Sequence, residues 1–163
     1  MFRSNALQGT VERDLLPMAR KLDLAVTPWA VIGGGILTGK YNKNKDEQGR
    51  AQLHKTINPE NLNIAEKVIE IADEVGCTPV QVAINWVRQQ AGVIIPIIGA
   101  KTEMQLKENI DCLNFNLSEE QMSNLSEATK IDLGFPHTFL NGDYTRTLIF
   151  GGTYDKIDNH HKK

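Results

Sequence analysis

The sequence "LAVTPWAVI", residues 24–32, runs directly into "GGGILTGKY", residues 33–41, and this junction decides the fold. A short apolar run that ends at glycines is typical of a buried β-strand. A second run, "VIIPII" at residues 93–98, is too continuous for a half-exposed sheet. We expect it to be covered on both faces, as parallel strands are. Strands that alternate with helical segments predict an α/β fold with a parallel sheet.

Several helices are expected around these strands. Residues 10–22 have apolar side chains at helical spacing, but Pro17 lacks an N–H and predicts a kink or a late start. A helix over about 62–75 is expected to end at Gly76. Capping boxes lie at residues 78–81, 102–105 and 118–121. They predict the starts of three helices, which are expected to end near residues 90, 112 and 129, respectively.

The domain organisation is expected to be a single incomplete domain over residues 1–163. Residues 41–60 are polar and are predicted to form a long exposed loop, and residues 134–163 an irregular C-terminal tail. Two parallel strands do not make a self-sufficient core. We therefore expect this chain to be part of a larger α/β domain.

Composition excludes several classes of function. The chain has 163 residues and a formal net charge of -2, which gives no reason to expect nucleic acid or an anionic membrane as a partner. No apolar run approaches the roughly 20 residues that span a bilayer, and the first residues lack the apolar core of a signal peptide. Cys77 and Cys112 match no metal or redox spacing, and His160 and His161 are expected in a solvated end. We expect a cytoplasmic protein with reduced cysteines and no metal site.

The glycine-rich stretch invites comparison with a phosphate-binding loop. Read from Gly34, it is G-x-x-x-x-G-K-Y, whereas nucleoside triphosphatases have Ser or Thr at the last position to hold magnesium. Tyr41 is a poor metal ligand, and the residues after it lack a helical apolar period. This comparison leaves two interpretations open: a glycine turn without a ligand, or a different phosphate cradle.

The second junction favours a cradle. Gly99 and Lys101 lie between a strand end and a capped helix start, where N–H groups and a cation suit a phosphate. Gln105, Glu108 and Asn109 share one helix face and suit the base and ribose of a nucleotide. The alternative for this face is an ordinary solvated helix surface.

The two junctions resemble the aldo-keto reductase family. "VTPWAVIGGGILTGKY" is similar to the family's seventh strand and following loop, and "IPIIGAKTEMQLKENI" to its eighth strand and adenine-nucleotide loop. "TVERDLLPMARKLDL" resembles the helix between the sixth and seventh strands, and "GFPHTFL" and "GGTYDKID" resemble C-terminal segments of some bacterial members. The resemblance covers residues from about 5 to 158.

This resemblance implies a partial (β/α)₈ TIM barrel, namely the C-terminal portion with about strands seven and eight and their helices. The family binds NADPH and reduces aldehydes or ketones, and Lys101 implies NADP rather than NAD as the cofactor. The residues implied to contact the cofactor are Trp29, Ala30, Val31, Ile32, Gly33, Gly35, Thr38, Lys40, Arg50, Gly99, Lys101, Gln105, Glu108 and Asn109.

The chain also departs from the family pattern. Ala30 and Val31 stand where the family usually has Ser and Pro, and Ser4 falls where an aromatic ring normally stacks on the nicotinamide. The family's catalytic Asp, Tyr, Lys and His lie on earlier strands, and we name no catalytic residue: Tyr41, Tyr144 and Tyr154 do not match.

These departures leave three hypotheses. The first is an NADP(H)-binding portion that is inactive alone and pairs with a complementary barrel fragment or with itself, because its strand faces are apolar. The second is a non-catalytic nucleotide-binding or interaction module. The third is a truncated gene remnant.

Overall fold

The computed structural model describes residues 2–3, 10–44 and 46–158. The chain divides into two compact units, Met1–Lys130 and Ile131–Lys163. The first unit holds both strand–helix junctions. Within the described residues, no helix is long and apolar enough to cross a membrane.

Short parallel segments pair within the first unit. β1 (Phe2–Arg3) pairs in parallel with β2 (Pro28–Trp29), with Phe2 opposite Pro28. A further segment, residues 93–97, runs parallel beside residues 26–28, through a bridge between Val26 and Ile94. The amide of Ile97 donates to the carbonyl of Pro28 at 2.7 Å. Residues 26–29 therefore belong to a parallel sheet, as predicted, but β1 was not anticipated.

The strands are shorter than predicted. Only Pro28–Trp29 of the expected strand 24–32 is regular, because Asp23 (φ 53°) and Ala30 (φ 57°) adopt left-handed conformations that end extended backbone. The expectation that residues 93–98 are covered on both faces is wrong. The side chains of Val93 and Ile95 are 56% and 53% exposed, whereas Ile94 packs against the core. Successive side chains of an extended segment point to opposite faces, and only one of these faces is covered.

The helices confirm most of the local predictions. Residues 10–22 form α1 (Thr10–Arg13) and α2 (Leu15–Lys21). The two helices are separated at Asp14, because Pro17 has no N–H to donate to the carbonyl of Arg13. α5 (Pro59–Val75) begins earlier than expected, since Asn58 accepts a hydrogen bond from Asn61, and it ends at left-handed Gly76 as predicted.

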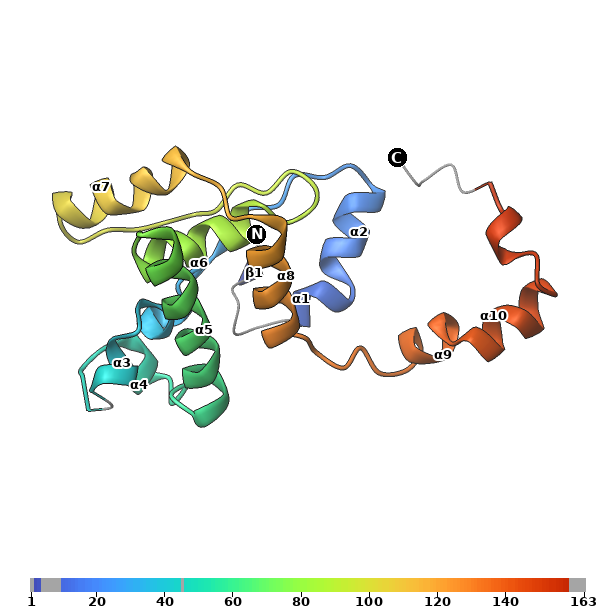
Figure 1. The fold of residues 1–163 in the computed structure, drawn as a ribbon, viewed down its shortest axis with the longest axis horizontal. Coiled ribbons are helices and arrows are strands. Elements are labelled where there is room, and N and C mark those ends of the chain that lie inside the picture. The colour runs from blue at the N-terminus through green and yellow to red at the C-terminus, as the bar shows by residue number, and fades with distance from the viewer. Residues whose placement is uncertain (1, 4–9, 45, 159–163) are drawn as a thin grey trace. The chain divides into compact units, whose positions relative to one another are not determined.

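The three capping residues each begin a helix. Thr78 and Ser118 form complete capping boxes at the starts of α6 (Pro79–Arg88) and α8 (Glu119–Ala128). Thr102 caps α7 (Glu103–Asp111), which continues into the 3₁₀ helix η2 (Cys112–Asn114). α5 packs against α6 and α8, and α6 packs against α7 (Figure 1). The main core of the first unit is the buried apolar cluster that includes Ile36, Leu37, Tyr41, Val68, Val82 and Leu125.

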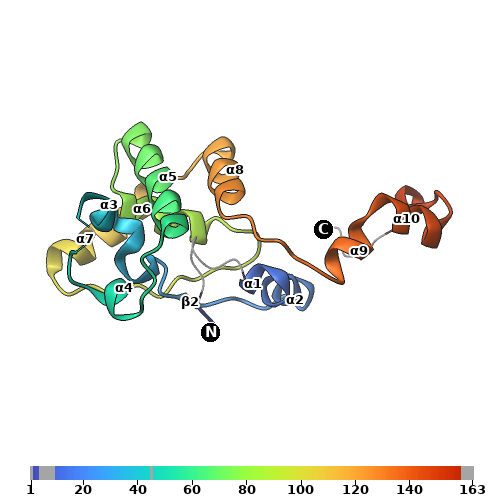
Figure 2. The same ribbon diagram turned by 90° about the horizontal axis from the view of Figure 1, so that it is seen from below.

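The segment after the glycines differs from the exposed loop that we expected over residues 41–60. It contains α3 (Lys40–Lys43) and α4 (Arg50–Leu53), which follow the 3₁₀ helix η1 (Gly33–Thr38). Tyr41 and Ala51 are fully buried in the main core, although most side chains between them are exposed. Figure 2 shows α3 and α4 on the side of the first unit that also carries α5 and α7. The segment is thus anchored at both ends.

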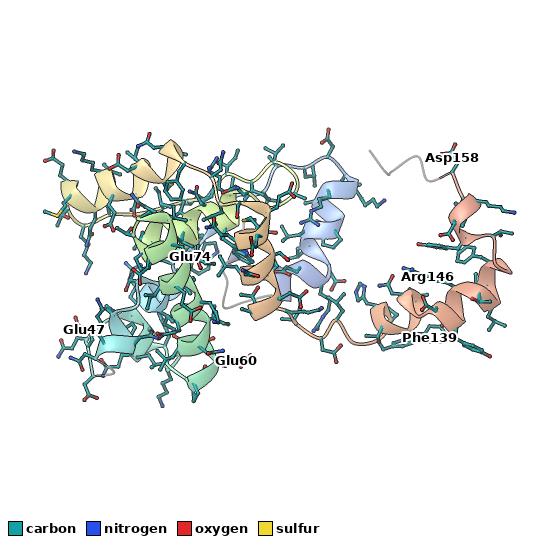
Figure 3. The ribbon with its side chains drawn as sticks, in the orientation of Figure 1. Glu47, Glu60, Glu74, Phe139, Arg146 and Asp158 are labelled. Atoms are coloured by element: carbon teal, nitrogen blue, oxygen red, sulfur yellow. The ribbon has the colours of Figure 1, made fainter. Side chains whose placement is uncertain are left out.

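The second unit is helical where an irregular tail was expected. It contains α9 (His137–Asn141), α10 (Asp143–Phe150) and the 3₁₀ helix η3 (Tyr154–Lys156). Asp143 complements the dipole of α10, and left-handed Gly151 ends this helix. The guanidinium of Arg146, labelled in Figure 3, lies 4.7 Å from the centre of the Tyr154 ring. These local contacts fold the unit on itself.

Candidate functional site

The two glycine-containing junctions leave the sheet at the same edge. The first follows β2, and the second follows residues 93–97, which run parallel to β2 and are hydrogen-bonded to it through Ile97 and Pro28. The carboxyl ends of neighbouring parallel segments meet on one side of a sheet. The parallel pairing therefore brings together the two segments that the sequence assigned to phosphate binding.

The first junction is a tight turn built on left-handed residues. Ala30, Gly33, Gly34 and Gly35 all have positive φ values, of 57°, 59°, 69° and 98°. The amide of Gly33 donates to the carbonyl of Ala30 at 2.9 Å, and the amide of Gly35 donates to the carbonyl of Ile32 at 3.0 Å. Such successive left-handed conformations are sterically open mainly to glycine, so the glycines are needed for the turn itself.

The residues of this turn that are expected to contact the cofactor differ in how exposed they are. Val31 and Gly33 are buried, whereas Trp29 is 44% exposed. The Thr38 hydroxyl donates to the carbonyl of Gly35 at 2.8 Å. Thr38 thus braces the turn in this structure.

Arg50 joins the turn through α4. A Cβ atom added to Gly34 would lie 3.8 Å from the Cβ of Arg50 and 3.6 Å from the amide of Ala51. The polar segment therefore folds back against the glycines, and the structure brings Arg50 beside the turn although the two lie apart in the sequence.

Lys40 begins α3 and reaches over the same region. Its ammonium donates to the carbonyl of Gln48 at 2.9 Å and lies 4.0 Å from the carboxylate of Glu47, which is labelled in Figure 3. A Cβ atom added to Gly35 would lie 3.6 Å from Cε of Lys40. The lysine stem therefore lies close to the glycine backbone.

Tyr41 contributes a buried polar atom that the sequence analysis assigned to no ligand. Its side chain is fully buried, and its Oη forms no hydrogen bond within the described part of the chain. Such a group is costly unless a ligand or a water satisfies it. A buried donor, the Lys40 ammonium and a tight glycine turn together fit a phosphate group.

The second junction is organised by Gln105. Thr102 accepts the amide of Gln105 at 3.2 Å, as a helix cap should, but the Gln105 side chain accepts the amide of Lys101 at 2.9 Å. The predicted capping box is therefore only half formed. Lys101 itself is exposed, with its amide direction fixed by Gln105.

The remaining residues of this junction are partly engaged. The Asn109 side chain is 8% exposed and its amide donates to the carbonyl of Gly99 at 3.5 Å. The carbonyl of Glu108 accepts a hydrogen bond of 3.0 Å from Gln81 on α6, which fixes α7 against the core. A Cβ atom added to Gly99 would have no neighbouring atom within 4 Å, so packing does not require glycine at this position. The polar helix face is thus partly structural.

Gln48 and Gly49 were not among the site residues expected from the sequence, and Tyr41 was expected to be a poor metal ligand. All three gather at Lys40. The only sequence signal was the position of Tyr41 directly after the lysine. Ser4, expected near the nicotinamide, lies outside the described residues.

Comparison with known proteins identifies the family. The model of the aldo/keto reductase family matches residues 3–130. The chain belongs to the aldo/keto reductase family. The match covers both junctions and every residue expected to bind the cofactor, so the family resemblance read from the sequence is confirmed.

Curated relatives of this aldo/keto reductase chain carry names of carbonyl and alcohol chemistry. AAD10 of Saccharomyces cerevisiae, named as an aryl-alcohol dehydrogenase, is 33% identical over 85% of this chain and 50% of its own length. Norsolorinic acid reductase B of Dothistroma septosporum is 29% identical over 85% of this chain and 36% of its own length. This chain therefore spans half or less of the length of these relatives.

A shorter relative and a solved structure complete the comparison. YFL057C of Saccharomyces cerevisiae, also named as an aryl-alcohol dehydrogenase, is 30% identical over 77% of this chain and 87% of its own length. The crystal structure of a thermostable aldo-keto reductase in complex with the inhibitor epalrestat superposes with a TM-score of 0.58, at 21% identity. The superposition covers 77% of this chain and 38% of that one. The chain is thus a partial aldo-keto reductase barrel, with few regular strands.

Proposed function

We propose that this chain is the NADP(H)-binding portion of an aldo-keto reductase barrel, corresponding to about strands seven and eight with their helices. One observation carries the proposal. Two glycine-containing junctions follow neighbouring parallel segments, and each contains a lysine, Lys40 in the first and Lys101 in the second. In barrel enzymes, phosphate sites are frequently built from the loops after the last two strands.

Different residues bind different parts of the dinucleotide. The glycine turn after Trp29 and the side chains of Lys40 and Arg50 hold the pyrophosphate, together with the other residues expected there: Ala30, Val31, Ile32, Gly33, Gly35 and Thr38. Lys101 neutralises the 2′-phosphate, because a cation there gains from a doubly charged group. Gly99, Gln105, Glu108 and Asn109 surround the adenosine.

The bound NADPH supplies the hydride for carbonyl reduction. Reduction also needs a positioned acid, and the family's catalytic motifs have no counterpart at Tyr41, Tyr144 or Tyr154. We therefore propose that Met1–Lys163 is one incomplete domain that holds the cofactor without turning over carbonyls alone. The bare faces of Val93 and Ile95 suit a complementary barrel fragment or a second copy.

Titration of the purified chain with NADPH and NADH, followed by nucleotide fluorescence, tests the proposal. We expect NADPH to bind more tightly, and Lys101→Ala to weaken NADPH about 10-fold by removing one charge-assisted contact while leaving NADH unchanged. Lys107→Ala, at an exposed position on α7, which follows Lys101, serves as the matched control. Equal affinities for the two nucleotides would contradict the role of Lys101.

An activity assay separates binding from catalysis. Because several relatives are named for aryl alcohols, aromatic aldehydes are the substrates to offer with NADPH. We expect nucleotide binding without oxidation of NADPH. Steady turnover by the chain alone would show that the catalytic group lies within these residues after all.

A further inference from the structure

The corner between α9 and α10 contains Asn141–Gly142, the one place in the sequence where a glycine follows an asparagine. Asn141 is the last residue of α9, and its side chain is exposed. Gly142 leaves the helix with extended backbone, at φ -67° and ψ 137°. Because glycine has no Cβ, its backbone nitrogen is open to close approach by the side chain before it. The corner therefore places a carboxamide next to an unshielded amide nitrogen.

The amide of Gly142 is held only loosely by the rest of the second unit. It donates to the carbonyl of Phe139 at 3.3 Å, which is longer than an ordinary hydrogen bond of this kind. The carbonyl of Gly142, in contrast, accepts the amide of Arg146 at 3.0 Å. An amide nitrogen must lose its proton before it can attack a carbon atom, and a weak hydrogen bond opposes that loss less than a strong one. The nitrogen of Gly142 is thus the readily available nucleophile of the corner.

Arg146 binds the carboxamide oxygen that the attack would charge. Its Nη2 donates to Oδ1 of Asn141 at 3.2 Å. The same guanidinium, labelled in Figure 3, lies 4.7 Å from the centre of the Tyr154 ring, which restricts where it can move. When a nucleophile adds to a carboxamide carbon, negative charge develops on the oxygen, and a fixed cationic donor at that oxygen lowers the barrier. The second unit therefore supplies the nucleophile, the carbon it attacks and a donor for the developing charge.

We propose that Asn141–Gly142 is a self-modifying site, at which the Asn141 carboxamide becomes a carboxylate without an enzyme. The backbone nitrogen of Gly142 gives its proton to water and bonds to Cγ of Asn141, while Arg146 stabilises the charge on Oδ1. The bond from Cγ to Nδ2 then breaks, and Nδ2 takes up a proton and leaves as ammonia. Water opens the resulting cyclic imide at either carbonyl. The products carry aspartate or isoaspartate at position 141.

The two products affect the corner in opposite ways. Aspartate preserves the backbone and replaces the neutral acceptor of Arg146 with a charged one. Isoaspartate routes the main chain through the side chain and adds a methylene, which displaces the hydrogen bonds on both sides of Gly142. Each conversion also adds one negative charge to a chain whose formal net charge is -2. The first product keeps the start of α10, and the second disrupts it.

Tryptic peptides of the full chain, incubated at mildly alkaline pH, compare the site with internal controls. Peptide 131–146 contains Asn141. Peptide 108–130 contains four asparagines that are each followed by a larger residue: Asn109, Asn114, Asn116 and Asn124. The last three are exposed, as Asn141 is. We expect mass spectrometry to show the mass increase of deamidation in peptide 131–146 well before peptide 108–130. Equal conversion of the two peptides, or none in peptide 131–146, would overturn the inference.

Two variants test the nucleophile and the charge separately. A Cβ atom at Gly142 would lie 3.4 Å from the Phe139 carbonyl oxygen, and its φ suits any residue, so Gly142→Ala keeps the corner. We expect Gly142→Ala to slow deamidation about 10-fold by shielding the nitrogen. Arg146→Ala should slow it about 5-fold, because the charged donor to Oδ1 is lost.

Conservative and control variants decide whether the charge of Arg146 is responsible. Arg146→Lys should restore part of the rate, since it keeps a cation on α10. Lys156→Ala, which removes an exposed cation from the same unit, should leave the rate unchanged. Faster deamidation of Arg146→Ala would mean that Arg146 holds the carboxamide away from Gly142, which contradicts the proposal. A loss of rate that Arg146→Lys does not restore, or that Lys156→Ala reproduces, would contradict it as well.

Discussion

The backbone amide of Lys101 donates a hydrogen bond of 2.9 Å to the side-chain oxygen of Gln105, one turn further along. Gln105 thereby fixes the backbone that carries the exposed lysine, in place of closing the capping box with Thr102. A side chain expected to face adenine is thus occupied in orienting the loop that carries Lys101.

Replacing Gln105 with Ala should loosen this loop and weaken NADPH binding by about 3- to 10-fold, which corresponds to one hydrogen bond. The unfolding free energy should change little, because Thr102 still caps α7. Fluorescence titration and thermal melting measure the two effects. Gln121→Ala, which removes the corresponding side chain from α8, should leave NADPH affinity unchanged; a loss with that variant would point to a general effect on stability.

Gly39 and Gly76 offer a matched pair for stability. Both are left-handed, with φ 76° and 72°, but a Cβ at Gly39 would lie 2.7 Å from Cδ1 of Ile69, whereas Gly76 has open space. Gly76→Ala should cost about 1–2 kcal/mol from backbone strain alone, and Gly39→Ala should cost more, since Ile69 must move. Urea unfolding gives both values. Equal losses of unfolding free energy for the two variants would mean that the side chain of Ile69 moves aside without a further loss of stability.

Ile94 and Ile95 point to opposite faces of one strand. Ile95 is 53% exposed, whereas Ile94 packs against the main core and against a smaller buried cluster of Val11, Leu16, Ala19 and Val26. Ile95→Lys should leave the fold intact and reduce self-association, because it places a charge on a bare apolar face. Ile94→Lys should destabilise the chain by several kcal/mol. Light scattering and thermal melting report the two outcomes, and persistent association of Ile95→Lys would exclude this face as the contact.

Cys112 predicts a dependence of stability on pH. Burial raises the pKa of its thiol, an effect opposed by Arg88 and reinforced by Asp111. The unfolded thiol loses its proton first, near its usual pKa of about 8.5, so the stability due to Cys112 is lost as pH rises through that value. Cys112→Ala should flatten the fall in stability between about pH 8 and 10, measured by urea unfolding. Burial also raises the pKa of Cys77, so Cys77→Ala should have a smaller effect of the same sign, since this thiol is less buried.

Local chemistry was the most predictable part of the fold. The caps at Thr78 and Ser118, the helix stop at Gly76 and the interruption near Pro17 each depend on neighbours within one turn. The strand boundaries were less predictable, since the left-handed backbone at Ala30 is unusual for that residue. The helices of the second unit were missed because only α10 carries recognisable end signals.

The candidate site was predictable in its parts and not in its arrangement. The spacing within each junction pointed to Lys40 and Lys101, and the structure shows that the segments before the two junctions pair in parallel. The convergence of Tyr41, Gln48 and Gly49 on Lys40 depends on how residues 41–60 fold back, and no periodic pattern reports that path. The structure alone shows that these residues meet.

The sheet joins segments that lie far apart in the sequence, and this sets an order of folding. We expect Val26 to pair with Ile94 only after the helices between them have collapsed, because closing the intervening chain costs entropy that local helix contacts first offset. The amides of Val26, Ile95 and Ile97 should consequently exchange with solvent deuterium sooner than those inside α5 and α6. We therefore expect the pairing between residues 26–28 and 93–97 to form later than α5 and α6 and to open before them.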